Sequence, residues 1–321
     1  MARGELHAPD YRPHFSGHET FPLRYGWLNK AFEAVAAAKN LEETIALFQS
    51  EAAIARFGVG RNMVSAIKHW ALATNVIENG KKPGSVRTAD FGKLLFGNNG
   101  IDPFVEHPSS LWAIHWRLAS PPERTTWHWA FNYFSPPTFE RETLVNGLDA
   151  LAKERGWTRV ARGTIKRDVE CFLRSYVAKN ITASSSLDDA LESPLIELGL
   201  IQPIGKRDGF RLHRGRKPSL GDGVFAYAIA DFWGRSTGAA TLNFETVAYE
   251  PGAPGRVFLL DEDELIARLS EIEETTGGAV QWSETAGLKQ LIRSVDAAEF
   301  HELKHRYLEL DYPVPTAERA A

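Results

Sequence analysis

Apolar residues recur every three to four positions in two neighbouring segments of the first third of the chain, which predicts a pair of helices. The first helix is expected over residues 41–50 and the second over residues 61–73, with a glycine turn at residues 57–60 between them. Short segments at 75–78 and 85–88 then flank a glycine-containing basic tip, as in a hairpin. Helix, turn, basic-faced helix and hairpin in this order predict a winged helix-turn-helix unit.

The same order of elements is predicted again further along the chain. A helix over residues 144–155 is followed by a glycine break and by a second helix over residues 165–178, for which Thr164 is the expected N-cap. Segments at 200–204 and 210–214 flank an Asp-Gly turn and form a second candidate wing. Two units with the same order of helices and strands are therefore expected.

The last third of the chain is less regular. We expect a strand at residues 256–260 and helices at 265–274, 288–294 and 301–307. Proline and glycine clusters place domain boundaries near residues 137 and 241. The sequence thus predicts a mainly α protein with small β-hairpins (α+β), built from a winged-helix domain with aromatic segments (1–137), a second winged-helix-like domain (138–240) and an acidic C-terminal α+β region (241–321).

Charge is distributed unevenly, although the formal net charge is only -4. Basic residues gather in the two predicted units, whereas acidic residues crowd 261–274. Basic segments within an acidic whole indicate a localised anion-binding face. The single cysteine, Cys171, excludes an internal disulfide framework, and no apolar stretch is long enough to span a bilayer or to form a signal peptide. A cytoplasmic protein with no membrane partner is expected.

Basic and polar side chains on the second helix and wing of each unit are the candidate DNA contacts. Arg and Asn in the first turn of such a helix can reach base edges in the major groove, and the other cations can hold phosphates. The base-reading candidates are Arg61, Asn62, Lys166 and Arg167. The other DNA-binding candidates are Ser65, Lys68, Lys81, Lys82, Arg87, Arg162, Arg174, Lys206, Arg207 and Arg211.

Candidate catalytic groups are few. His18 and Glu19, in an irregular polar segment, could supply a base and a metal-binding oxygen, and Asp168 could bind Mg²⁺ or Mn²⁺. Each also has a structural interpretation, because Glu19 could pair with Arg24 and Asp168 could be an ordinary helix residue. No known nuclease, nucleotide-binding or dinucleotide-binding motif is present, so the residues alone do not establish catalysis or identify a metal.

Aromatic residues are dense at 111–116 and 127–134. They could stack on unpaired bases. Their helical spacing, as in Trp112 and Trp116, instead favours a buried core.

Several segments together resemble a known bacterial family. The segment at 16–28, SGHETFPLRYGWL, resembles its N-terminal signature, and FGVGRNMV at 57–64 resembles its glycine turn and second helix. The aromatic segments at 111–116 and 126–132 are similar to those of the same family. The resemblance, from about residue 15 to 300, is to the SspB-like proteins of Ssp-type DNA phosphorothioation systems, formerly a domain family of unknown function.

This resemblance implies a DNA-nicking component whose partners are a cysteine desulfurase and an ATP-dependent sulfur-transfer enzyme. A nick in one strand of duplex DNA would open the backbone for sulfur incorporation in a bacterial defence system. Two alternatives remain: a non-catalytic recognition or transcription-regulatory subunit that recruits the sulfur-transfer enzymes, and a scaffold that contacts proteins through the acidic third region. The resemblance carries over no catalytic residues, and the recognised DNA sequence and the oligomeric state stay open.

Overall fold

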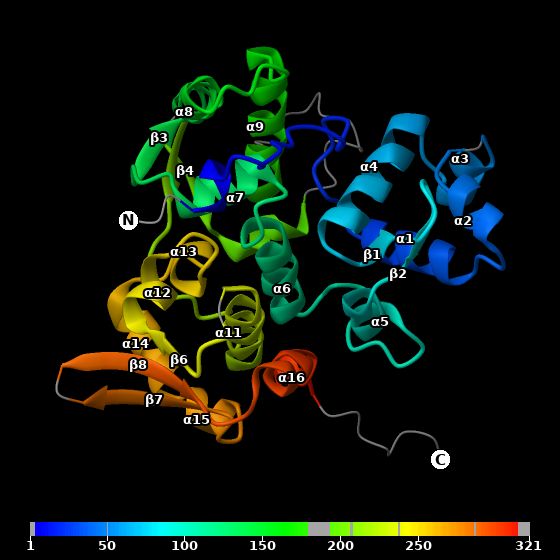
Figure 1. The fold of residues 1–321 in the computed structure, drawn as a ribbon. Coiled ribbons are helices and arrows are strands. Elements are labelled where there is room, and N and C mark those ends of the chain that lie inside the picture. The colour runs from blue at the N-terminus through cyan, green and yellow to red at the C-terminus, as the bar shows by residue number, and fades with distance from the viewer. Residues whose placement is uncertain are drawn as a thin grey trace.

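A computed structural model of the protein describes residues 4–49, 51–178, 193–205, 208–236, 238–285 and 287–313. Helices dominate it, and its strands form three small antiparallel sheets (Figure 1). The expectation of a mainly helical fold with small β-hairpins is confirmed at this level. A short 3-10 helix, η1 (Glu5–His7), precedes the first α-helix. No helix in the described ranges is long and apolar enough to cross a membrane.

The first unit follows the order expected from the sequence. Its elements are α1 (Trp27–Ala36), α2 (Leu41–Ala46), α3 (Glu51–Phe57), α4 (Arg61–Ala73), β1 (Ile77–Asn79), β2 (Val86–Thr88) and α5 (Asp90–Phe96). Between α3 and α4 the backbone of Gly58 has φ 65, a left-handed conformation that residues with a Cβ rarely adopt. Val64, Ile67 and Trp70 are buried beneath α4. The helix predicted at 41–50 is α2, which ends at Ala46, and a further helix that was not predicted, α3, precedes the glycine turn. Strands β1 and β2 pair as a two-stranded hairpin.

The second unit has a third strand that the sequence pattern did not indicate. It comprises β3 (Thr138–Glu140), α8 (Arg141–Glu154), α9 (Arg162–Tyr176), η2 (Pro194–Leu198), β4 (Ile201–Ile204) and β5 (Gly209–Leu212). The sheet order is β3-β5-β4, so the last strand lies between the other two. Thr164 is not the N-cap of α9, since the helix begins at Arg162 and Ala161 occupies the cap position.

The C-terminal third repeats this strand arrangement, which the sequence analysis missed. Its elements are α11 (Asp222–Ser236), β6 (Thr241–Asn243), α12 (Phe244–Tyr249), α13 (Pro254–Val257), α14 (Glu262–Ser270), α15 (Ile272–Thr275), β7 (Val280–Thr285), β8 (Leu288–Arg293) and α16 (Ala297–Glu309). The order β6-β8-β7 matches β3-β5-β4. Two expectations were wrong. In place of the strand expected at 256–260, residues 254–257 form a short helix that starts at proline. In place of the helix expected at 288–294, residues 288–293 form a strand paired with β7.

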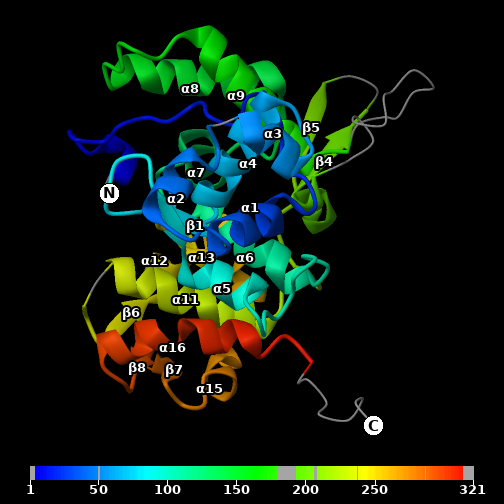
Figure 2. The ribbon, with the colours of Figure 1, turned by 90° about the vertical axis from the view of Figure 1, so that its right-hand side faces the viewer.

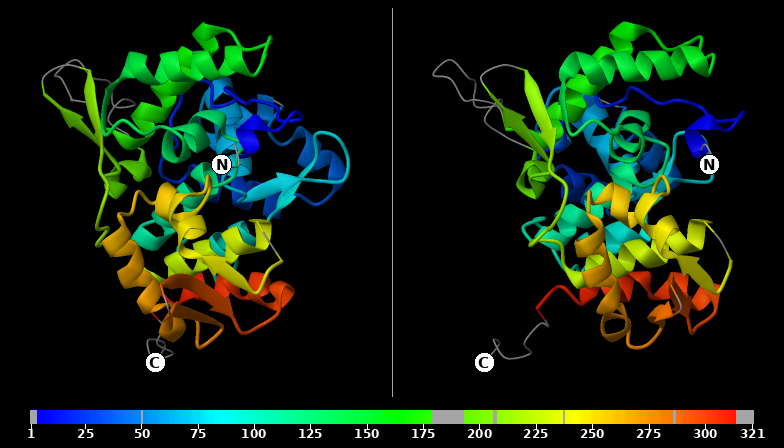
Figure 3. Two further views of the ribbon diagram at one scale, coloured as in Figure 1. Left: turned by 60° about the vertical axis from the view of Figure 1, so that its left-hand side comes forward. Right: turned by 90° about the vertical axis from the view of Figure 1, so that its left-hand side faces the viewer.

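One buried apolar cluster extends through all three regions. Its centre is formed by α6 (Pro108–Ala119), α7 (Thr125–Asn132) and α11. Trp112, Trp116, Trp127 and Phe131 are fully or almost fully buried there, so the aromatic segments form core. Figure 2 shows α8 and α9 at one end of the molecule and α16 with β7 and β8 at the other. In both views of Figure 3, the β4–β5 hairpin lies at the α8–α9 end, far from β7 and β8.

Candidate nucleic-acid interface

Helix α4 presents three of its predicted contact residues to solvent. Arg61, Asn62 and Ser65 are exposed, because the apolar residues of α4 face α1 and α3. The guanidinium of Arg61 is 3.8 Å from the Glu51 carboxylate, and both side chains are largely exposed. Such a long exposed pair contributes little stability, so Arg61 can exchange it for a ligand. Lys68 differs, since its ammonium lies 5.7 Å from the centre of the Phe48 ring and burial lowers its pKa.

The hairpin after α4 carries basic side chains at its tip. Lys81 and Lys82 lie between β1 and β2 and are exposed, and their side chains make no hydrogen bond or ion pair with any residue that the structure describes. Arg87 on β2 pairs with Glu78 on β1 at 3.0 Å. The two lysines are therefore available to phosphates, whereas Arg87 also stabilises the hairpin.

Helix α9 divides its basic residues between two roles. The side chains of Lys166 and Arg167 are exposed and form no hydrogen bond or ion pair within the described parts of the chain. Arg162, in contrast, contacts Glu142, lies 3.3 Å from Asp149 and donates to Asn146 at 2.6 Å. All three partners belong to α8. Arg162 therefore joins α9 to α8, which the sequence alone did not reveal.

The remaining predicted contacts also differ in their surroundings. Arg174 donates to the Thr20 carbonyl at 3.1 Å, and Arg211 donates to Gln202 across the β4–β5 pair at 2.8 Å. Lys206 and Arg207 lie outside the described residues. Of these four, Arg211 is the one that the structure shows exposed on a strand beside the predicted wing tip.

Two of the predicted catalytic residues, 150 positions apart in sequence, meet in the structure. His18 Nε2 lies 2.8 Å from Asp168 Oδ1, and both residues are buried. The Thr20 N–H donates to His18 Nδ1 at 3.0 Å, so Nδ1 is an acceptor and Nε2 carries the proton given to Asp168. Asp168 Oδ2 is buried without a hydrogen-bond partner among the described residues. The contact joins the N-terminal segment to α9.

The segment that carries His18 has an uncommon backbone conformation. Glu19 and Thr20 have φ 49 and φ 66, respectively, in the left-handed region. Non-glycine residues there carry strain, which persists only where surrounding contacts impose it. The hydrogen bonds from His18 to Asp168, from Thr20 to His18 and from Arg174 to Thr20 impose it here. Glu19 is left exposed on this segment, which runs between α9 and α4 in Figure 1.

Further polar residues, which the sequence reasoning did not select, surround this contact. The imidazole of His69 on α4 lies edge-on to that of His18, with ring centroids 5.7 Å apart, and stacks with that of His14 at 5.9 Å. Burial, together with Arg124, His18 and His14, holds the pKa of His69 well below its usual range. Burial also lowers the pKa of Arg124. His14 and Arg124 showed no periodic signal, because only folding brings them to α4 and α9.

The chemistry available at this junction is limited. No group of three or more His, Cys, Asp or Glu side chains within the described ranges is placed to hold a metal ion. Cys171, three residues after Asp168, is fully buried, and burial raises the pKa of its thiol well above the usual value, so it is not a nucleophile. The junction has one exposed carboxylate, Glu19, above the buried His18–Asp168 hydrogen bond.

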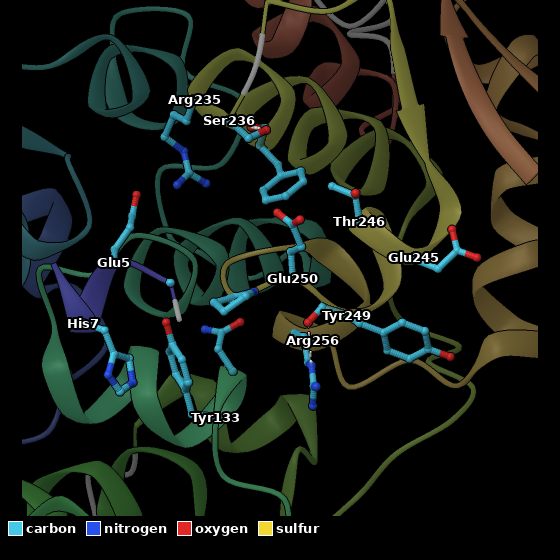
Figure 4. A pocket seen from close by; sticks show the side chains of 14 residues that line it. Glu5, His7, Tyr133, Arg235, Ser236, Glu245, Thr246, Tyr249, Glu250 and Arg256 are labelled. Atoms are coloured by element: carbon cyan, nitrogen blue, oxygen red, sulfur yellow. Dashed lines mark hydrogen bonds between the residues drawn. The ribbon is translucent and has the colours of Figure 1, made fainter. Parts of the chain in front are cut away.

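A cavity of about 860 Å³ lies elsewhere, between η1, α7, α11 and α12. Figure 4 shows Glu5, Arg235 and Glu250 around its interior, with Tyr133 below and Arg256 near one edge. Burial raises the pKa of Glu5, and Arg235 opposes this shift. None of the predicted catalytic or DNA-binding residues lines this cavity. Its size alone therefore does not make it the nucleic-acid site.

Comparison with known proteins gives two kinds of match. The sequence pattern of a family described as "Protein of unknown function (DUF4007)" matches residues 15–312. A magnesium ion-bound crystal structure of SspB is similar with a TM-score of 0.81 and 27% identity, covering 95% of this chain and 90% of that chain. A second SspB crystal structure is similar with a TM-score of 0.80 and 27% identity, covering 95% of this chain and 91% of that chain. None of the curated proteins compared with the chain matches it.

Proposed function

This chain belongs to the DUF4007 family and is SspB-like, and from that premise we propose that it binds duplex DNA in a bacterial phosphorothioation system and nicks one strand. The observation that supports the proposal best is the junction of α4 and α9. The His18–Asp168 hydrogen bond joins one polar segment to α9, and the Trp70 indole of α4 donates to the Phe21 carbonyl of the same segment at 3.0 Å. Two helices with exposed cations therefore lie beside this segment. Such an arrangement can hold the DNA backbone next to the exposed carboxylate of Glu19.

We treat the first unit and the second unit as two winged helices. In the first, α4 enters the major groove, where Arg61 and Asn62 in its first turn read base edges and Lys81 and Lys82 hold a phosphate. In the second, α9 follows α8 and precedes the β4–β5 wing, with Lys166 and Arg167 exposed. The strand order β3-β5-β4 supports this assignment, because the wing hairpin then extends a sheet that includes the strand before α8.

The buried His18–Asp168 pair has a positioning role, and the exposed Glu19 carboxylate has the catalytic role. His18 has both ring nitrogens engaged, so in this conformation it cannot accept a proton from water or substrate. It fixes the turn at Glu19 and Thr20 instead. Glu19 is then the residue that can orient water at a phosphodiester, with Arg124 close enough to Asp168 for their charges to interact.

The oxygen donors at the junction fit a magnesium ion only if a DNA phosphate supplies further ligands to the same ion. Mg²⁺ is commonly held by one or two carboxylates together with waters and substrate phosphates. Asp168 Oδ2, which has no partner among the described residues, and the Glu19 carboxylate are the oxygen donors that this junction offers. When bound, the ion would stabilise negative charge on the phosphate. The magnesium ion in one SspB crystal structure supports this choice of metal.

A plasmid assay tests nicking. Supercoiled plasmid is incubated with the full chain and Mg²⁺ or Mn²⁺, beside an EDTA control, and open circles are counted. We expect metal-dependent nicking that Glu19→Gln reduces strongly and that Asp168→Asn reduces as well. Glu170→Gln is the matched control, because Glu170 lies two residues from Asp168 on α9 and pairs with Arg141. Absence of open circles with either metal would contradict nicking.

A second candidate function is DNA recognition without catalysis. Burial of His18 and Asp168, and the lack of a metal-holding group of three side chains within the described ranges, favour it. In that case the plasmid stays supercoiled, yet Arg61→Ala and Lys166→Ala still weaken DNA binding. In both functions the partners are a cysteine desulfurase and an ATP-dependent sulfur-transfer enzyme. Co-elution of the purified proteins in size-exclusion chromatography, with and without duplex DNA, tests that association.

A further inference from the structure

A buried guanidinium lies far from the α4–α9 junction, between α6 and α11. Arg117 lies against two aromatic rings, with its Cζ 5.1 Å from the centre of the Phe91 ring and 5.5 Å from that of Tyr227. It forms no ion pair with a carboxylate of the described chain, and its Nε is buried without a hydrogen-bond partner there. The two ring centres are 6.4 Å apart, so the rings flank the guanidinium on adjacent sides and not on opposite faces. The N–H groups of the guanidinium still require acceptors.

The nearest buried carboxylate does not supply them. Asp231 accepts from Lys304 at 3.0 Å, from Arg235 at 3.3 Å and from the Trp116 indole at 2.9 Å. Against the effect of burial, Tyr227 and Asp231 also attract Arg117 and raise its pKa. This one carboxylate is therefore shared by three cations, Arg117, Arg235 and Lys304, so the cluster keeps a net positive charge. Burying cations in excess of their counter-charge is costly, and an anion that completes the site would remove that cost.

A cavity of about 330 Å³ opens beside this guanidinium. Its lining includes Arg117, Lys304 and His305, together with Glu78 and Asp90. Both of these carboxylates already have a cation of their own, since Glu78 pairs with Arg87 and Asp90 with Lys93. A third acid in the lining, Glu302, is exposed. The lining thus carries two cations, Arg117 and Lys304, beside three acids of which two are already paired. The volume lies at the lower end of the range for small-molecule sites, roughly 300–1,000 Å³.

Two histidines, His301 and His305, line the cavity, and His305 is neutral. Burial, together with the charges of Arg117 and Lys304, lowers the pKa of His305 to about 4. Its Nε2 is buried without a partner among the described residues, and its ring stacks on Tyr227 with centroids 6.2 Å apart. A neutral imidazole retains one N–H, which can donate to an oxyanion.

We propose that this cavity, called here the Arg117 cavity, binds the phosphate group of a small molecule. Arg117 and Lys304 supply the opposite charge and His305 supplies a hydrogen bond, while Phe91 and Tyr227 keep the guanidinium fork rigid. A guanidinium fork matches two oxygens of a phosphate, and preorganisation lowers the entropic cost of binding. The site joins α5 of the first unit to α16 near the C-terminus, so a bound phosphate would link the two.

Phosphorus NMR tests the proposal with the full chain in a chloride buffer. Inorganic phosphate and AMP are the two probes, and each is titrated with protein. We expect saturable binding, weakened about tenfold to a hundredfold in Arg117→Met, as for the loss of one or two charge-assisted hydrogen bonds. Tighter binding of AMP would identify a nucleotide as the source of the phosphate, and equal binding would identify the free ion.

Two further variants make the result decisive. His305→Phe keeps a ring against Tyr227 but removes both nitrogens, so it should weaken binding even if Arg117→Met folds poorly. Arg256→Met is the matched control, because Arg256 lines the larger cavity and not this one. Absence of saturable binding, or equal affinity in wild type, Arg117→Met and His305→Phe, would overturn the proposal. Displacement of phosphate by a short duplex, with DNA affinity reduced in Arg117→Met, would overturn it in favour of a DNA phosphate.

Discussion

The two basic helices α4 and α9 carry similar residue types but use them differently. At the start of α4, Arg61 has only a long pair with Glu51 at 3.8 Å, between two largely exposed side chains. At the start of α9, Arg162 is held by Glu142, Asp149 and Asn146 of α8. One arginine is free to meet a ligand, and the other is a structural link between helices. A count of basic residues along the sequence cannot separate these roles.

The units also differ in how their hairpins are supported. The β1–β2 hairpin forms a sheet of two strands, whereas β4 and β5 are joined by β3 from before α8. A three-stranded sheet holds its hairpin more rigidly than an isolated pair, which is at best marginally stable by itself. We therefore expect the β1–β2 hairpin to be the more adaptable of the two, and the β4–β5 hairpin to be held in position by its sheet.

The largest predicted effect concerns the contact that holds the two helices in one geometry. Asp168→Ala leaves the Nε2–H of His18 buried without its acceptor, so unfolding should become easier by about 1.5–3 kcal/mol, the range for a hydrogen bond to a charged group. Chemical denaturation measures this change. Glu170→Ala, at a half-buried surface ion pair, should cost less than about 1 kcal/mol. Equal losses in both variants would mean that Asp168 does not join the units.

Acidification tests the same junction through His69. Burial holds the pKa of His69 well below its usual value of 6.5, so the folded protein keeps it neutral. The unfolded chain binds a proton more readily below pH 6.5, so the contribution of His69 is complete above that pH and is lost as the pH falls below it. Denaturation midpoints at pH 8 and pH 5.5 measure the loss. His69→Phe should reduce this dependence; an unchanged dependence would place its origin elsewhere.

The next effect separates the two helices as DNA ligands. Arg61→Ala and Lys166→Ala should each weaken binding to a specific duplex by about 1–2 kcal/mol, or roughly tenfold, while stability changes little. Fluorescence anisotropy measures the affinity and thermal unfolding checks the fold. If one variant alone loses affinity, then only its helix contacts DNA. Unchanged affinity in both would refute the winged-helix proposal.

Arg162→Ala should show the opposite behaviour to Arg61→Ala. Loss of its contacts with α8 should reduce stability by up to about 1 kcal/mol, the upper range for exposed ion pairs, with little change in DNA affinity. Fluorescence anisotropy measures the DNA affinity, and thermal unfolding measures the stability. A clear loss of affinity with unaltered stability would remove the distinction between the two arginines.

The smallest effect is expected at the first wing. Changing Lys81 and Lys82 together to Gln should weaken binding mainly at low salt, because phosphate contacts act through counterion release. The slope of log affinity against log salt should fall by about 1–2 units, one for each phosphate contact. Measurement at several salt concentrations tests this. An unchanged slope would show that the wing does not contact the backbone.

The helices with strong apolar periodicity were predictable because their burial depends on local spacing. The order of α2, α4, β1 and β2 and that of α8, α9, β4 and β5 follow from the pattern of apolar residues and glycines, whereas α3 was not predicted. The C-terminal third was predicted less well. Residues 288–293 form a strand that pairs with β7, its neighbour in sequence, and with β6, which is distant in sequence. The pairing with β6 is not encoded by any local pattern.

The sequence by itself determined the helical units, the apolar core and the kinds of charge that each unit carries. Only the tertiary structure decided which charges are free, since Arg162 meets α8 while Lys166 does not. It also decided that His18 and Asp168 share a hydrogen bond across 150 positions, and that Arg117 lines a cavity with residues of α16. The physical reason is that hydrogen bonds and ion pairs act over a few ångströms in space, whereas periodicity reports only on neighbours along the chain.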